Sequence, residues 1–133
     1  MTDTSITIIT IPLIPPSLNQ SVGYAARYGH KRQDHQKFKD DVILLTRGKK
    51  APLLAVRFDV EIRVFIAERP WEQVPDIDNL PKTLLDALVA AEVFPDDRFI
   101  SDCTARRRKA NGIRDERTVI TIRAAVDEVD EIY

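Results

Sequence analysis

Apolar and charged side chains alternate most regularly over residues 56–67. Six apolar residues there alternate with four charged ones, and this period of two predicts a strand with one face on a core and the other in water. The β-branched residues 6–13 predict another strand, buried on both faces. Residues 100–109 and 118–124 predict two more, and the Asn111-Gly112 pair between them favours a hairpin.

A first helix is predicted over residues 34–46. Three apolar residues share one of its faces at helical spacing: Phe38, Val42 and Leu45. Gly48 follows as a stop signal. From the Pro15-Pro16 pair to about Arg32 the sequence predicts a loop, because each proline fixes its own φ and disfavours helix at the residue before it.

A second helix is predicted over residues 80–91. Its buried stripe consists of four leucines, Leu80, Leu84, Leu85 and Leu88. Pro81 suits the first turn, and Asp78 or Asn79 can cap the free N–H groups there. The loop before this helix contains the single tryptophan of the chain, Trp71, which we expect to pack against the core.

The predicted elements follow the order β-α-β-α-β-β, which indicates an α+β (α/β-like) fold with a mixed sheet and two main helices. At 133 residues the chain has the size of a single domain, which we assign to residues 1–126, followed by an acidic tail at 127–133. With 44% hydrophobic and 31% charged residues, the composition excludes a disordered or collagen-like chain.

Charge is distributed unevenly along the chain. The formal net charge is -1, which by itself argues against a nucleic acid as partner. Residues 27–50 and 98–126 each carry eight bases and three acids, whereas residues 51–97 between them carry four bases and ten acids. The near-neutral total therefore results from two basic segments that flank an acidic one.

Two features of the sequence indicate the compartment. Cys103 is the only cysteine, so no internal disulfide forms, as is typical of a reducing environment. The uncharged residues 4–26 are interrupted by prolines and follow no basic segment, so they do not predict a membrane span. We expect a cytoplasmic protein that does not contact a membrane.

The acidic segment contains Asp76 and Asp78 before the second helix and Asp97 after it. An extended lead-in points the first two carboxylates the same way, and a return strand beside the first would bring Asp97 to them. Carboxylates brought together need a cation, and oxygen ligands select Mg²⁺, with Mn²⁺ as a substitute, over zinc. Such a site polarises a phosphoryl group and generates hydroxide from bound water, while Lys82 stabilises the developing charge.

The same residues also have an ordinary structural interpretation. Asp76 and Asp78 can be capping and loop residues. Lys82 can pair with Asp86 at i+4, and Asp96-Asp97 can form a turn. The D-x-D spacing is short enough to arise by chance, so the residues alone leave both interpretations open.

The run D-I-D-N-L-P-K at residues 76–82, with D-A-L after it and Asp96-Asp97 at unchanged spacing, resembles the signature of the RusA family of Holliday-junction resolvases. The P-P-S-L-N segment at residues 15–19 is similar to the turn that follows the family's opening strand. The resemblance covers most of the chain, from about residue 6 to residue 122. It implies a crossover junction endodeoxyribonuclease that acts in DNA recombination and repair.

The resemblance also implies roles for individual residues. Asp76, Asp78 and Asp97 match the family's metal-binding aspartates. Lys82 matches its functional lysine. Glu92 stands where the family commonly has a small residue, often glycine, at the end of the helix, and this difference concerns the turn before Asp97.

Basic residues on both sides of the acidic segment suit contacts with DNA phosphates, although a solvated charged face is the usual meaning of such runs. In a strand, Arg106 and Arg108 face one side while Arg107 and Lys109 face the other, so the four do not all reach one ligand. The candidates for DNA contact are Lys31, Arg32, Lys49, Lys50, Arg106 and Arg108.

The sequence therefore predicts a Mg²⁺-dependent endonuclease that makes paired cuts in four-way DNA junctions and needs no organic cofactor. A junction is close to two-fold symmetric, so a homodimer is expected. One alternative is a non-catalytic branched-DNA binder whose acids hold a structural ion. Another is an aspartate-dependent phosphohydrolase with Asp76 as nucleophile. Such enzymes have D-x-D at the end of a hydrophobic strand, whereas here residues 71–75 stand between the predicted strand and Asp76.

Overall fold

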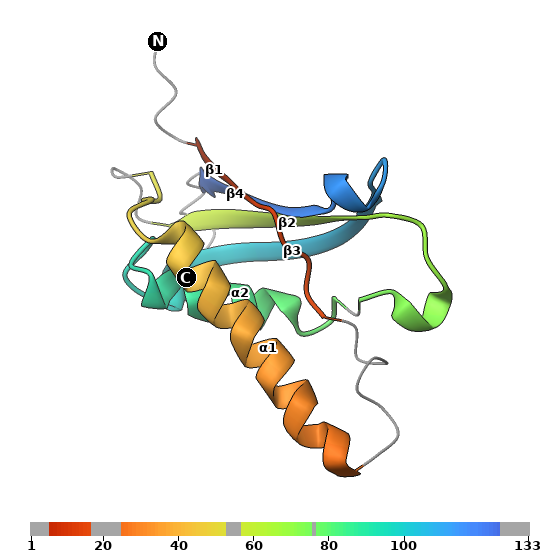
Figure 1. Cartoon of the computed structure of the whole chain (residues 1–133). Coiled ribbons are helices and arrows are strands. Elements are labelled where there is room, and N and C mark those ends of the chain that lie inside the picture. The colour runs from red at the N-terminus through yellow and green to blue at the C-terminus, as the bar shows by residue number, and fades with distance from the viewer. Residues whose placement is uncertain (1–5, 17–24, 53–56, 76, 126–133) are drawn as a thin grey trace.

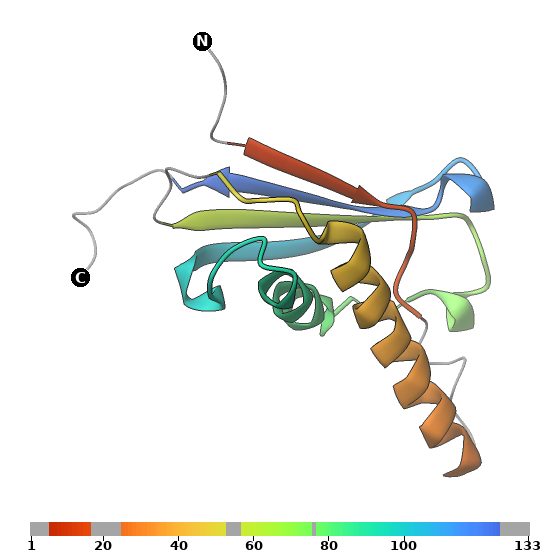
Figure 2. The ribbon, with the colours of Figure 1, turned by 60° about the vertical axis from the view of Figure 1, so that its left-hand side comes forward.

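Two helices lie on one side of a four-stranded sheet in this computed structural model (Figure 1, Figure 2). The structure describes residues 6–16, 25–52, 57–75 and 77–125, except for the side chains of residues 25–34, 72 and 97. The elements are β1 (Ile6–Ile11), α1 (Ala25–Thr46), β2 (Phe58–Ile66), α2 (Leu80–Ala90), β3 (Ile100–Lys109) and β4 (Arg117–Ala124). The predicted α+β class and element order are confirmed; the predicted acidic tail at 127–133 lies outside the described residues.

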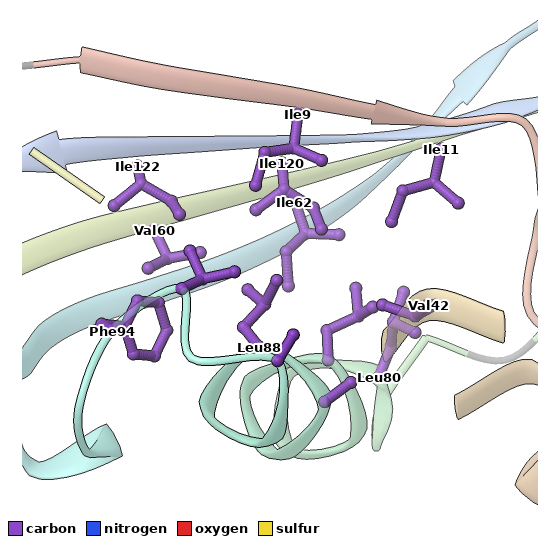
Figure 3. Close-up of a cluster of buried hydrophobic side chains, with 14 of the residues drawn as sticks. Ile9, Ile11, Val42, Val60, Ile62, Leu80, Leu88, Phe94, Ile120 and Ile122 are labelled. Atoms are coloured by element: carbon purple, nitrogen blue, oxygen red, sulfur yellow. The ribbon is translucent and has the colours of Figure 1, made fainter. Parts of the chain in front are cut away.

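The core lies between the sheet and the two helices. Burial alternates strictly along β2, as the period of two predicted, and its five buried side chains face the helices. Figure 3 shows Ile9, Ile62 and Ile120 of the sheet pointing toward Leu80 and Leu88 of α2. Each such side chain stabilises the fold by roughly 1.5–3 kcal/mol when fully buried. This packing fixes α2, and therefore the residues at its two ends, relative to the sheet.

The side of the sheet without helices, called the open face below, leaves part of β1 in solvent. Ile9 and Ile11 are buried under the helices, whereas Ile8, directly before Ile9, is 62% exposed on the open face. The expectation that this strand is buried on both faces is therefore wrong. Its cause is the position of β1 at an edge of a sheet that, among the described residues, has helices on one side only.

The last two strands do not form the predicted hairpin. The strand order is β1-β4-β2-β3, so β3 pairs parallel with β2, and β4 pairs antiparallel with β1 and β2. The side chains of residues 118–122 in β4 are all buried, which suits the interior of the sheet. Residues 106–109 of β3 are four exposed bases, which suit an edge strand. The apolar content of each strand therefore determines its place in the sheet, and it outweighs the hairpin that the Asn111-Gly112 pair favours.

Helix α1 begins at Ala25, inside the segment for which a loop was predicted up to Arg32. That segment contains no proline after residue 16, and one glycine costs a helix only about 1 kcal/mol. Its buried line is Phe38, Val42 and Thr46, whereas Leu45 is 44% exposed. The helix ends where predicted, at Thr46, and Gly48 follows with a φ of 93°, in the left-handed region. No helix within the described ranges is long and apolar enough to cross a membrane.

Candidate active site

The start of α2 carries two of the predicted site residues. Asp78 is exposed immediately before the helix, and Lys82 is exposed in its first turn. Asn79 is the N-cap residue but makes no side-chain hydrogen bond to the helix, so the cap predicted for it is not formed. The first N–H groups of a helix, together with its dipole, favour a bound anion. This end of α2 is therefore suited to a phosphate group.

Lys82 does not make the ion pair of the structural interpretation. Asp86 lies one turn further along α2, but no ion pair joins Lys82 to it or to any other residue whose side chain the structure describes. The ammonium group is thus available to a ligand that approaches the start of the helix.

Residue 97 lies at the opposite end of α2 from Asp78. The eleven residues of this helix span about 16 Å. Arg107 Nε donates a hydrogen bond of 3.1 Å to the carbonyl of Pro75, so the lead-in to α2 lies beside the second half of β3, whereas residue 97 precedes the start of β3. Within one chain, the expected return strand therefore does not bring residue 97 to Asp78, and Asp76 lies outside the described residues. β3 is parallel to β2, so it must start at the other end of the sheet.

The metal-ligand assignment stays a prediction. Asp76 and the side chain of Asp97 lie outside the described part of the structure. Among the side chains that it does describe, no group of three or more His, Cys, Asp or Glu residues gathers as a metal site. Carboxylates alone are a donor set that fits Mg²⁺, and Asp78 is placed and exposed as such a ligand must be.

Asp96, next to the third candidate, has a local structural role. Its carboxylate accepts a hydrogen bond of 2.9 Å from the backbone N–H of Arg98, and the guanidinium of Arg98 lies 3.6 Å from the other carboxylate oxygen. These contacts shape the short 3-10 turn at Asp97–Phe99 that leads into β3.

The loop between β2 and α2 is fastened to the sheet at both ends. Where it starts, the Glu116 carboxylate accepts a hydrogen bond of 2.8 Å from the N–H of Ala67 and pairs with the guanidinium of Arg69. Where it ends, Arg107 holds the carbonyl of Pro75, whose ring is buried. The start of α2 is therefore positioned through this loop as well as through the core.

Trp71 lies in the middle of this loop, in a 3-10 turn at Trp71–Gln73, and 76% of its surface is exposed. The expectation that it packs against the core is wrong. One signal in the sequence was available, because most of its neighbours are charged or polar: Glu68, Arg69, Glu72 and Gln73.

The predicted DNA-contact residues whose side chains the structure describes do not form one patch. Lys31 and Arg32 belong to α1, and their side chains are outside the description. Lys49 and Lys50 are exposed after α1, and Lys50 Nζ donates a hydrogen bond of 2.9 Å to the carbonyl of Glu92 beyond the end of α2. These lysines therefore lie near the end of α2 that is remote from Asp78.

The remaining pair of candidates, Arg106 and Arg108, is exposed on the open face. Two arginines that the sequence did not single out are their neighbours: Arg63 and Arg117 lie with their guanidinium carbons 5.8 Å and 3.9 Å from the centre of the Phe65 ring. Phe65 is the register partner of Arg108 in β3 and of Arg117 in β4. This arginine cluster (residues 63, 106, 108 and 117) depends on strand order, which no local signal reveals. Its charge suits DNA phosphates.

The open face is acidic where β2 and β3 begin. Asp59 and Asp102 are register partners there. Partial burial, together with the carboxylate of Asp102, raises the pKa of Asp59, and the guanidinium of Arg57 opposes this shift. On the other side of β3, burial raises the pKa of the Cys103 thiol, which agrees with an inert, half-buried apolar residue.

A pocket of about 700 Å³ adjoins the end of α2 that is remote from Asp78. Its lining is mainly aromatic and aliphatic, with Phe58, Val93, Phe94 and Phe99 among its residues. Such a lining gives a metal ion or a phosphate few polar partners.

A protein-family model described as endodeoxyribonuclease RusA matches residues 12–123. The match covers more than four fifths of the chain and includes both helices, β2, β3 and nearly all of β4. No curated protein matches the sequence.

Proposed function

The chain belongs to the RusA family of Holliday-junction endodeoxyribonucleases, and on this premise we propose that it cuts four-way DNA junctions by paired, Mg²⁺-dependent phosphodiester hydrolysis in DNA recombination and repair. The family match over residues 12–123 carries the proposal. The exposed Asp78 and Lys82 at the start of α2 support it, because a helix N-terminus and a free ammonium group both suit a phosphate. We also assign the protein to the cytoplasm, a reducing compartment in which a lone cysteine is ordinary.

In the proposed mechanism, Asp76, Asp78 and Asp97 hold the metal. Bound Mg²⁺ would supply Lewis-acid polarisation of the phosphoryl group and activation of water, and Mn²⁺ could replace it. Lys82 stabilises the negative charge that develops on the phosphoryl oxygens. The first N–H groups of α2 orient the same phosphate.

A homodimer that shares its metal sites reconciles this ligand set with the fold. Metal ligands lie within about 2.0–2.6 Å of a Mg²⁺ or Ca²⁺ ion, whereas one chain keeps Asp78 and residue 97 at opposite ends of a helix about 16 Å long. Under two-fold symmetry, Asp97 of the partner subunit can approach Asp78, and the same axis creates a second site for the paired cut.

The fold weighs against an aspartate-dependent phosphohydrolase. That chemistry places its D-x-D sequence directly after a hydrophobic strand, but β2 ends at Ile66, and the whole fastened loop separates it from Asp76. The non-catalytic DNA binder shares the same surface, so only a cleavage assay separates it from the nuclease.

The first prediction concerns Asp78→Asn. We expect the wild type to cut a synthetic four-way junction in Mg²⁺ and to bind it without cutting in Ca²⁺. The Asp78→Asn variant should bind with unchanged affinity but cut at least about 100-fold more slowly, because a charged ligand of the metal is lost. Asp102→Asn, an exposed acid of the open face, is the matched control and should cut at the wild-type rate.

Two results would contradict the proposal. A wild type that binds junctions but leaves them intact in Mg²⁺ is a non-catalytic binder. Equal cleavage by Asp78→Asn and the wild type removes Asp78 from the metal site.

A further inference from the structure

Trp71 is the single tryptophan of the chain, and 76% of its surface faces solvent. An indole that stays in water contributes nothing to the core and leaves a large apolar surface hydrated. Packing therefore gives no reason for a tryptophan at this position.

The loop holds this indole in a defined place. Pro70 fixes its own φ at -57°, the N–H of Gln73 donates a hydrogen bond of 2.8 Å to the carbonyl of Pro70, and Val74 donates one of 3.1 Å to the carbonyl of Trp71. Both ends of the loop are also tied to the sheet, by Glu116 and by Arg107. Trp71 is thus presented by an anchored turn.

The turn lies at the end of the sheet where Asp78 and the arginine cluster also lie. Phe65, at the centre of that cluster, is the last residue but one of β2 and leads into the loop. The loop then ends at Asp78 and the start of α2. Figure 1 shows the turn, in green, at the end of the sheet that also carries the β3–β4 connection.

We propose that Trp71 stacks on a DNA base at the branch point of a junction and so positions the branch relative to the cleaved phosphate. This inference rests on the proposed function. An indole offers a flat apolar face that stacks on any base, so it needs no particular sequence. In a continuous duplex the faces of the bases are covered by their neighbours, whereas a branch point interrupts the stack. Trp71 therefore distinguishes branched from linear DNA.

The competing explanation for an exposed tryptophan is that a second copy of the chain covers it. The two explanations differ in whether the Trp71 side chain is hydrated in the protein before DNA is added. A stacking residue is in water in the free protein, and an interface residue is not.

Fluorescence tests this directly because all tryptophan emission comes from Trp71. We expect the free protein to emit at the long wavelength of a hydrated indole. A four-way junction in Ca²⁺ should quench this emission, and a linear duplex of the same sequence should not. Emission that is already blue-shifted without DNA and does not change with the junction would place Trp71 at a subunit interface and overturn the inference.

Three substitutions separate stacking from apolar contact. Trp71→Ala should bind the junction roughly tenfold more weakly but the linear duplex as before. Trp71→Leu keeps an apolar side chain without a π face and should behave like Trp71→Ala, whereas Trp71→Phe should stay within about threefold of the wild type. A fluorescent base analogue next to the branch should report unstacking with the wild type and lose that signal with Trp71→Leu.

The outcomes distinguish this inference from the function on which it rests. If the wild type neither binds nor cuts junctions, the proposed function and the inference fail together. If the wild type cuts junctions while Trp71→Leu keeps the full preference for junction over duplex, only the inference fails. The melting temperature of each variant should equal that of the wild type, because the substituted side chain is exposed.

Discussion

Glu92 has the backbone conformation that usually belongs to glycine. Its φ is 63°, in the left-handed region, where a Cβ is crowded by the following carbonyl. The N–H of Glu92 donates to the carbonyl of Val89, and the N–H of Val93 donates to that of Leu88, each at 2.9 Å. This is the hydrogen-bond pattern of the Schellman motif, which most often has glycine at the position of Glu92. The turn before Asp97 therefore keeps a glycine-type geometry, at a steric cost.

We expect Glu92→Gly to stabilise the protein. Removing the Cβ relieves about 1 kcal/mol of strain, which should raise Tm by roughly 3–5 °C in thermal unfolding. The hydrogen bond from Lys50 is to the carbonyl of residue 92 and is retained. Glu92→Ala removes the same charge but keeps the Cβ, so it should show no such gain. Equal Tm values for the two variants would mean that φ is not the cause.

The ladder between β2 and β3 brings two acids together on the open face. Asp59 and Asp102 are register partners, and Asp59 is also partly buried. Both circumstances disfavour its ionised form, which is why its pKa is raised in the folded chain. A raised carboxyl pKa means that ionised Asp59 destabilises the fold at pH values above that pKa, and that the penalty disappears once the group is protonated in both states.

Asp59→Asn should therefore raise the free energy of unfolding at pH 7, by roughly 0.2–1 kcal/mol as for other cross-strand pairs of like charge. The gain should fade as the pH drops through the raised pKa and vanish well below the unfolded pKa of about 3.9, where unfolded and folded Asp59 are both neutral. Denaturant unfolding at several pH values measures it. Asp102→Asn removes one cause but leaves the burial of Asp59, the larger cause, so its gain should be smaller. A constant gain across this pH range would show that ionisation is not responsible.

The elements were more predictable from the sequence than their arrangement. β2 follows from local alternation and α2 from its leucine stripe, because these signals depend on neighbours in the chain. The insertion of β4 between β1 and β2 does not follow from the Asn111-Gly112 pair, because strand order is decided by which strand buries both faces. The arginine cluster around Phe65 depends on that strand order, so it could not be predicted from the sequence either.

For the site, the spacing of the acids and the family resemblance predicted which residues take part, but not how they are arranged in space. The sequence placed Asp78 and Lys82 correctly at the start of a helix. It could not show that residue 97 lies at the other end, because that depends on whether the returning strand is parallel or antiparallel to the first.

For the molecule as a whole, the proposed shared site makes a prediction that two inactive proteins can test. Asp78→Asn and Asp97→Asn should each be inactive alone. In a mixed dimer with shared sites, one site contains both substitutions and the other contains neither. Mixing the two variants should therefore restore nicking of one strand of the junction, at up to about half of the wild-type turnover in each mixed dimer.

The matched control mixes Asp76→Asn with Asp78→Asn. These residues belong to the same chain in each shared site, so both sites of the mixed dimer keep one substitution and activity should not return. Sites built within single chains would leave both mixtures inactive, and that result would refute the shared arrangement. Strand-specific end labels distinguish a single nick from a paired cut.

The position of β4 also governs how the protein is made. β1 is synthesised early, but its register partners lie in β4, and the Thr118 hydroxyl donates a hydrogen bond of 2.7 Å to the carbonyl of Leu13, 105 residues earlier in the chain. β2 likewise lacks one of its two neighbours until β4 arrives. On the ribosome, β1 and β2 therefore each keep an unpaired edge until residues 117–124 have left the exit tunnel. Completion of the sheet is thus a late event in translation, and a nascent chain halted before β4 is exposed to chaperones and proteases.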